Sequence, residues 1–216
     1  MAPVSIDMDL DELKQLANEG GLIAYFGYGS LVNPHTHRTN VLHYERAQLS
    51  GFARTWQARP DQADLPIALL SSSPSKPEDE LDGLLVFDRI ENLPALDERE
   101  AGYDRLELSS NSLALAGGRD LPECPLYVYS GRPPLAPERE HFILQSYLDA
   151  VLQGYLHQYG EQGAFRFMTR TAAFDTTLLA DRKEPHYPRA VNLAAEEITL
   201  IDGLTKLMKR TSAPLV

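Results

Sequence analysis

The chain has 216 residues, enough for one domain whose hydrophobic core needs no disulfide or structural metal. It carries 20 basic and 31 acidic residues, a formal net charge of −11, with 43% hydrophobic and 24% charged residues. This balance argues against a nucleic-acid surface and an anionic membrane surface, because both require a basic footprint. A small anionic substrate is compatible with it, since a local pocket can oppose the global charge.

Cys124 is the only cysteine, which excludes an internal disulfide and any multi-thiolate zinc or iron–sulfur site. A lone thiol suits a reducing compartment. The first ten residues do not have the pattern of a signal peptide, and no run of about 18 apolar residues occurs. We therefore expect a cytoplasmic protein with no membrane span, whose chemistry relies on carboxylates, hydroxyls, imidazoles and the backbone.

Hydrophobic periodicity and turn residues place strands in the middle of the chain and helices toward its ends. This order is typical of an α+β protein rather than of alternating βαβ units. Several short strands between turns favour a small closed or nearly closed sheet. No repeat or long linker interrupts the chain, so we expect one domain over residues 1–216. The predicted helices cover 5–19, 138–159 (ended by Gly160) and 196–209, and the predicted strands cover 22–28, 47–59, 66–70, 81–88, 103–108 and 126–129.

A pair of glycines follows the first predicted strand, in the run Gly27-Tyr28-Gly29-Ser30-Leu31. Glycine permits a positive φ and the close approach of a ligand, and successive free amides in such a turn form an anion-binding nest. The spacing matches neither a dinucleotide fingerprint nor a P-loop. The run therefore favours a carboxylate ligand over a nucleotide, and the alternative is an ordinary turn between strand and loop.

A carboxylate is predicted on the apolar face of a short helix. Leu93, Leu96 and Glu100 share one helix face, and the two leucines make it the buried one. Burial and the C-terminal end of the helix dipole both disfavour the ionised form of Glu100, as suits a general acid or base near neutral pH. The alternative is a structural ion pair with Arg99 or Arg105.

Other reactive residue types give weaker patterns. His35 and His37 form an H-x-H pair followed by His43, but no third ligand with a fitting spacing is evident, so we expect solvated or capping histidines and no metal. Ser30 lies outside a G-x-S-x-G motif. Cys124 precedes a proline at the start of a predicted strand, which favours a small buried residue over a nucleophile.

Two arginines are candidates for a substrate carboxylate. Residues 181–189 contain two prolines that stiffen the segment, and Arg182 or Arg189 would grip a carboxylate with two hydrogen bonds. The alternative is a surface loop with internal ion pairs. Tyr147 lies on the long predicted helix, where packing in the core is the simplest role for an aromatic side chain.

Taken together, these residues resemble the γ-glutamylcyclotransferase superfamily, which includes the ChaC-like and AIG2-like branches, and the run FGYGSL is most similar to the ChaC-like branch. Residues 25–31 (YFGYGSL) resemble the strand and YGS signature of the family, and residues 49–54 (LSGFAR) are similar to its second-strand element. Residues 96–103 (LDEREAGY) resemble the element that carries the catalytic glutamate, which falls on Glu100. Tyr147 matches a helix where family members place a tyrosine near the substrate. The resemblance spans about residues 22–160, and 161–216 form a C-terminal extension.

The resemblance implies an α+β fold, a small, mostly antiparallel β-barrel with flanking helices. It also implies a cofactor-free reaction in which the α-amine of a γ-glutamyl compound attacks its own γ-carbonyl and releases 5-oxoproline. Glu100 would transfer the proton, and the turn over 27–31 would bind the α-carboxylate. Tyr103, Tyr147 and the two arginines are further candidates for binding this small-molecule substrate.

An alternative keeps the same fold without catalysis. In that interpretation the chain is a binding module for a γ-glutamyl-like ligand or an interaction module, and Glu100 is only structural. A Glu100 carboxylate in a cavity within reach of the amides of residues 27–31 favours the enzyme, whereas an ion pair with Arg99 or Arg105 away from a pocket favours the binding module. The sequence leaves open whether glutathione, a γ-glutamyl amino acid or a γ-glutamyl amine is the substrate.

Overall fold

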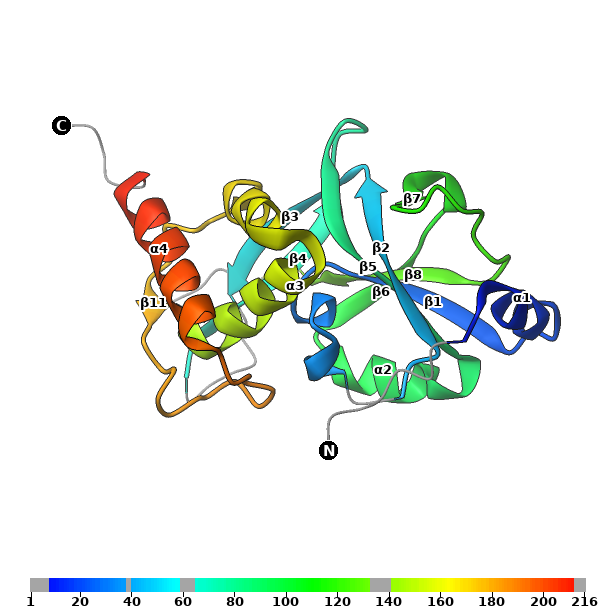
Figure 1. Cartoon of the computed structure of the whole chain (residues 1–216), viewed down its shortest axis with the longest axis horizontal. Coiled ribbons are helices and arrows are strands. Elements are labelled where there is room, and N and C mark those ends of the chain that lie inside the picture. Colours follow the sequence, from blue (N-terminus) through cyan, green and yellow to red (C-terminus); the bar gives the residue numbers. More distant parts are fainter. Residues whose placement is uncertain (1–7, 38–39, 59–64, 133–140, 212–216) are drawn as a thin grey trace. The chain divides into compact units, whose positions relative to one another are not determined.

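The structure is a computed structural model that describes residues 8–37, 40–58, 65–132 and 141–211 (Figure 1). The chain divides into two compact units. Unit 1 comprises Met1–Ala53 and Ser72–Arg132, and unit 2 comprises Arg54–Ser71 and Pro133–Val216. One domain over residues 1–216 stays a prediction.

Unit 1 is built on a sheet whose described strands follow the order β6-β8-β1-β5-β2-β7. The central strand β1 pairs with β5 antiparallel and with β8 parallel. Its side chains are buried throughout, which explains why its sequence is a continuous apolar run rather than an alternating pattern. The strands are β1 (Leu22–Gly27), β2 (His43–Ser50), β5 (Glu80–Arg89), β6 (Tyr103–Glu107), β7 (Leu113–Leu115) and β8 (Leu126–Gly131).

Two α-helices flank this sheet in the described part of unit 1, α1 (Leu10–Asn18) and α2 (Leu93–Arg99) (Figure 1). Asp9 caps α1 and forms a reciprocal capping box with Glu12, which fixes where the helix begins. The predicted helix over 5–19 is thus confirmed from residue 10, and residues 5–7 lie outside the described residues. The 3-10 turns are η1 (Ser30–Val32), η2 (Pro34–Thr36), η3 (Ile90–Asn92) and η4 (Ser110–Ser112).

Unit 2 holds a second sheet, with the described strands in the order β10-β3-β4-β9-β11. Several of its pairs are parallel, among them β4 with β9 and β3 with β10. The strands are β3 (Phe52–Ala58), β4 (Ile67–Pro74), β9 (Phe142–Leu144), β10 (Thr171–Ala172) and β11 (Leu178–Leu179), and the helices are α3 (Gln145–Thr169) and α4 (Ala195–Thr211). The predicted α+β class is confirmed.

Two glycines set element boundaries that the sequence placed differently. The single strand predicted over 47–59 is wrong in its continuity, because Gly51 adopts a φ of +79° and separates β2 from β3. Residue 59 lies outside the described residues. Gly160 interrupts α3 at a φ of +66°, as predicted, but a second helical segment follows it to Thr169.

The start of the long helix also differs from the prediction over 138–159. Residues 142–144 form β9, α3 begins at Gln145, and residues 138–140 lie outside the described part of the chain. No helix among the described residues has both the length and the apolar character needed to cross a membrane.

Asp181 supplies the cap that α3 lacks locally. The residue at the helix start, Leu144, offers no side-chain acceptor. The two carboxylate oxygens of Asp181 instead accept from the amide of Ser146 at 2.7 Å and from its hydroxyl at 2.6 Å, and one also accepts from the amide of His186 at 2.9 Å. This buried carboxylate therefore joins the start of α3 to the loop before α4.

Replacing Asp181 is expected to destabilise the protein. Asp181→Ala leaves the buried donors of Ser146 without an acceptor and should lower the free energy of unfolding by about 1–3 kcal/mol. Denaturant unfolding measures the change, with the exposed Glu184→Ala in the same loop as control. Equal unfolding midpoints for the two variants would contradict this capping role.

Candidate functional site

The glycine turn after β1 folds the chain back tightly on itself. A Cβ atom at Gly27 would lie 2.5 Å from the Cβ atom of Leu31, so only glycine fits there. Gly27 does not have a positive φ, so the close approach of Leu31 is the reason for a glycine at this position. Gly29 does not have one either, since its φ is −122°. Tyr28 and Ser30 are buried in the same turn.

The first two backbone amides of η1 are candidates for binding an anion. Ser30 and Leu31 occupy the first turn of η1, where amides have no acceptor within the helix. The next two amides, of Val32 and Asn33, donate to the carbonyls of Gly29 and Ser30 at 3.0 and 2.9 Å. The first two amides are the donors that a carboxylate or an oxyanion would use.

Glu100 caps the C-terminal end of α2. Its amide donates to the carbonyl of Leu96, and its own carbonyl accepts from the amide of Tyr103 at 2.8 Å. Its side chain is 14% exposed, and one carboxylate oxygen, Oε1, accepts from Nε of Arg99 at 2.9 Å. Of the two ion pairs considered from sequence, the pair with Arg99 is present, and Arg105 binds Asp97 instead.

Arg99 connects this glutamate to the glycine turn. Its Nη1 donates to the carbonyl of Thr36 at 3.0 Å. The hydroxyl of Thr36 donates in turn to the carbonyl of Ser30 at 2.7 Å. The two candidates found in the sequence, Glu100 and the turn over 27–31, are therefore joined within unit 1 by a short series of hydrogen bonds.

Two tyrosines of neighbouring strands belong to the same cluster. Burial, together with the carboxylates of Asp88 and Glu100, raises the pKa of Tyr25 far above its ordinary value, while the charge of Arg99 opposes this shift. Tyr129 donates to Asp97 at 2.6 Å, and burial is also the main cause that raises the pKa of Tyr129. Both phenols thus remain protonated at neutral pH and act only as neutral groups.

His37 is buried beside Arg99, contrary to the solvated or capping role predicted for it. Nε2 of His37 lies 2.9 Å from the carbonyl of Leu31 and must carry the proton, because a carbonyl only accepts. The pKa of His37 is lowered from 6.5 to about 4, and burial is the main cause. The hydrogen bond to the Leu31 carbonyl opposes this shift, and the charge of Arg99 contributes to it. His35, by contrast, is exposed as expected.

His37 gives the stability of the protein a defined pH dependence. Its folded pKa of about 4 lies below the ordinary 6.5, so the unfolded chain takes up the proton first as the pH falls. The stabilisation is complete above pH 6.5 and is lost as the pH falls toward 4. We expect His37→Gln, but not His35→Gln, to flatten the decline of unfolding free energy in this window. Denaturant unfolding at successive pH values tests this, and an unchanged slope in His37→Gln would contradict it.

The remaining predicted binding residues belong to unit 2, and their side chains contact other residues there. Arg182 binds Asp149 through two hydrogen bonds of 2.6 and 2.8 Å, and also binds Asp202 at 2.9 Å. Arg189 donates from Nε to the hydroxyl of Tyr187 at 3.0 Å. Tyr147 is buried against Tyr187, with ring centroids 4.8 Å apart. A role for these residues in substrate binding stays a prediction.

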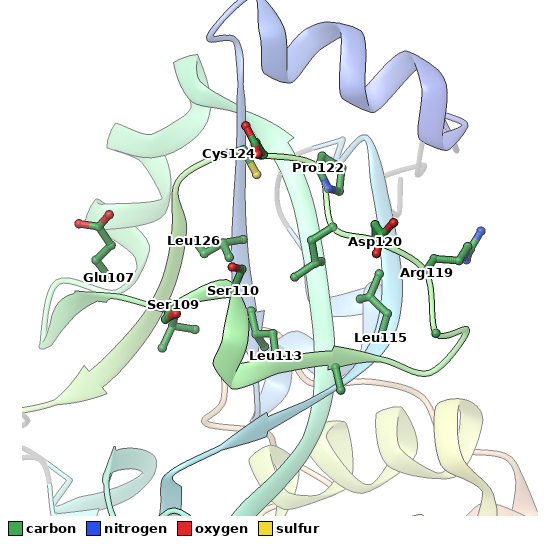
Figure 2. A pocket seen from close by; sticks show the side chains of 15 residues that line it. Glu107, Ser109, Ser110, Leu113, Leu115, Arg119, Asp120, Pro122, Cys124 and Leu126 are labelled. Carbon is green, nitrogen blue, oxygen red and sulfur yellow. The ribbon is translucent and has the colours of Figure 1, made fainter.

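A cavity of about 770 Å³ in unit 1 is lined by residues between Glu107 and Leu126 (Figure 2). Neither Glu100 nor the glycine turn lines it. Cys124 does, and burial raises the pKa of its thiol to about 12, so the sulfur is protonated and unreactive at neutral pH. Among the described residues, no three His, Cys, Asp or Glu side chains gather as metal ligands would.

Sequence reasoning singled out Glu100 and the glycine turn, and it included Tyr25 only as part of the motif over 25–31, without a role of its own. It missed Thr36 and the buried position of His37. No local pattern marks Thr36, because its partner Arg99 is 63 residues away along the chain.

Comparisons with known proteins bear on the fold. No protein-family model and no curated protein sequence matches the chain. Solved structures do: a γ-glutamyl cyclotransferase superposes with a TM-score of 0.50 at 18% identity, covering 84% of this chain and 99% of its own. An uncharacterized protein from Homo sapiens superposes with a TM-score of 0.49 at 18% identity, again covering 84% of this chain and 99% of its own. A glutathione-specific γ-glutamyl cyclotransferase from yeast superposes with a TM-score of 0.43 at 16% identity, covering 90% of this chain and 100% of its own.

At such identities a structural likeness concerns the fold, and the first of these three structures is the one on which the assignment rests. The two sheets and flanking helices agree with it. The chain therefore has the γ-glutamylcyclotransferase-like α+β fold, as the resemblance of its sequence motifs implied.

Proposed function

We propose that the protein is a γ-glutamylcyclotransferase-type enzyme, which releases 5-oxoproline from a small γ-glutamyl compound without a cofactor. One observation carries the proposal. The carboxylate of Glu100 lies at the end of α2 and is linked through Arg99 and Thr36 to the glycine turn. A proton-transfer group and a set of backbone donors are thus held in one cluster of a fold that a γ-glutamyl cyclotransferase shares.

The reaction requires few protein groups, because the nucleophile is part of the substrate. The α-amine attacks the γ-carbonyl carbon and forms the new C–N bond of the ring. The bond from that carbon to the leaving nitrogen then breaks as the leaving nitrogen takes up the proton that the α-ammonium lost. The ring nitrogen releases its remaining extra proton, which the freed amine takes up in water. Holding the γ-glutamyl chain in its folded conformation supplies much of the rate, as in other intramolecular reactions.

Each group of the cluster has a role in this scheme. Glu100 takes a proton from the α-ammonium and returns one to the leaving nitrogen. Its Oε1 accepts from Arg99, whereas Oε2 receives no hydrogen bond from the described residues and serves the proton transfer. The amides of Ser30 and Leu31 bind the α-carboxylate or the oxyanion that develops on the γ-carbonyl. Tyr103, whose amide donates to the carbonyl of Glu100, is a further candidate for binding the substrate.

A substrate panel tests the proposal. The purified protein is incubated with glutathione, with γ-glutamyl amino acids and with γ-glutamyl amines, and 5-oxoproline is quantified. We expect 5-oxoproline from at least one of these classes, which also identifies the substrate. Absence of product from all three classes, with protein verified as folded by circular dichroism, would reject the enzyme.

A second candidate is a binding module without catalysis. Two observations favour it: Glu100 forms an ion pair with Arg99, which is a sufficient reason for a carboxylate at this position, and Glu100 does not line the cavity described above. In that case γ-glutamyl compounds or 5-oxoproline bind in calorimetry and are recovered intact. Binding without turnover, unaltered by Glu100→Gln, would favour this module over the enzyme.

A further inference from the structure

Arg99 occupies an unusual position for a residue that only forms an ion pair. Its side chain is 6% exposed and its three nitrogens have separate environments. Nε donates to Glu100 and Nη1 donates to the carbonyl of Thr36, while Nη2 is buried and has no hydrogen-bond partner among the described residues. A buried charged donor without a partner costs free energy, so stability alone does not account for this guanidinium.

The planar guanidinium fixes the relative positions of two segments that are far apart in sequence. The Nε–H and Nη1–H bonds point in directions set by the rigid fork, so the carboxylate of Glu100 and the carbonyl of Thr36 are held in one geometry. The hydroxyl of Thr36 then donates to Ser30 at 2.7 Å and to Asn33 at 3.0 Å. The contacts run from the proton-transfer group to the backbone of the glycine turn.

We propose that Arg99 is a positioning residue, which holds the carboxylate of Glu100 at a fixed distance from the glycine turn through Thr36. The inference rests on the proposed function and adds to it the residue that aligns Glu100 with the glycine turn. In this role Arg99 acts on the reaction through Glu100, to whose Oε1 it donates. Reactions that rely on a tethered nucleophile depend on such alignment, and a displacement of about 1 Å can reduce the rate about 10²-fold.

Arg99→Lys tests the Arg99 end of this series. Lysine keeps the positive charge, but its single ammonium lacks the fork that spans Glu100 and Thr36. We expect kcat for 5-oxoproline formation to fall about 10²-fold, with KM close to the wild-type value, because alignment matters in the transition state more than in binding. Arg105→Lys is the matched control, since Arg105 pairs with Asp97 near the same helix and does not contact Glu100.

Substitutions of Thr36 test the other end of this series of hydrogen bonds, and they remain informative if Arg99→Lys fails to fold. Thr36→Ser keeps the hydroxyl that donates to Ser30, and Thr36→Val removes it with little change of shape. We expect the serine variant to retain kcat and the valine variant to lose it, again with KM nearly unchanged. Thermal unfolding of each variant separates this effect from a loss of folded protein.

Three results overturn the inference while leaving the proposed function in place. They are a wild-type kcat in folded Arg99→Lys, a wild-type kcat in Thr36→Val, or a rise in KM without loss of kcat, which would assign Arg99 to substrate binding. Failure of the proposed function is recognised separately, as no 5-oxoproline from the wild-type chain.

Discussion

Glu100→Gln is expected to lower the rate of 5-oxoproline formation by about 10²–10⁴-fold, the usual contribution of a general acid or base. Glutamine has nearly the same shape, and its carbonyl oxygen can still accept the hydrogen bond from Nε of Arg99. It cannot take up and return a proton. The loss should therefore appear in kcat, measured on the best substrate of the panel, while circular dichroism shows an unchanged fold.

Glu98→Gln is the matched control for this variant. Glu98 lies two residues earlier on α2 with an exposed side chain, so the change removes the same charge from the same helix. We expect its kcat to remain close to the wild-type value. A normal rate in Glu100→Gln would assign the proton transfer to another residue, and equal losses in both variants would point to a general effect of charge.

Gly83→Ala is expected to destabilise the protein by about 1–3 kcal/mol, the usual cost of overpacking a close-packed interior. A Cβ atom at Gly83 of β5 would collide with the carbonyl oxygen of Gly27 and would lie 2.5 Å from Cζ of Phe26. The first of these atoms is backbone in the central strand, so it cannot move aside without displacing the start of the glycine turn. Denaturant unfolding measures the stability, and activity should fall with it.

Gly203→Ala is the control for this substitution. Gly203 lies on the exposed side of α4, and a Cβ atom there meets nothing within 4 Å. Alanine is the better helix former by up to about 1 kcal/mol, so we expect this variant to be as stable as the wild type or more stable. An unfolding midpoint for Gly83→Ala that matches that of Gly203→Ala would contradict the tight packing behind the turn.

The sequence was most informative where burial alone decides the structure. The apolar run at Leu22–Gly27 predicts a buried strand, and β1 is the strand at the centre of the first sheet. Leu96 and Glu100 follow the helical period, so the carboxylate could be placed next to the core before the fold was known. Both signals are local and strong, because each depends on residues adjacent in sequence or one turn apart.

Strands whose partners are distant in sequence could not be predicted. β10 and β11 are each two residues long and pair in parallel with β3 and β9. So short a segment carries no periodicity of its own, and its conformation depends on a neighbouring strand that only the tertiary fold provides. The break at Gly51 was missed for a different reason, because the alternating pattern of the sequence continues on both sides of this glycine.

The candidate site could be predicted in its elements but not in its connections. Arg99 and Arg105 are both close enough in sequence to pair with Glu100, and tertiary packing decides between them. His37 illustrates the same limit. Its pattern with His35 is typical of a surface loop, yet the turn that follows β1 buries it against Leu31. Contacts between η2 and α2 arise only when the sheet brings these segments together.

The most direct test of the central claim is the identity of the products, followed over time with the wild-type protein and Glu100→Gln. A cyclotransferase converts its γ-glutamyl substrate into 5-oxoproline and an equal amount of the released amine, and it forms no glutamate. We expect this product pattern from the wild type and a rate lower by about two orders of magnitude or more from the variant. Free glutamate as the product, or no 5-oxoproline from folded wild-type protein, would contradict the proposed chemistry.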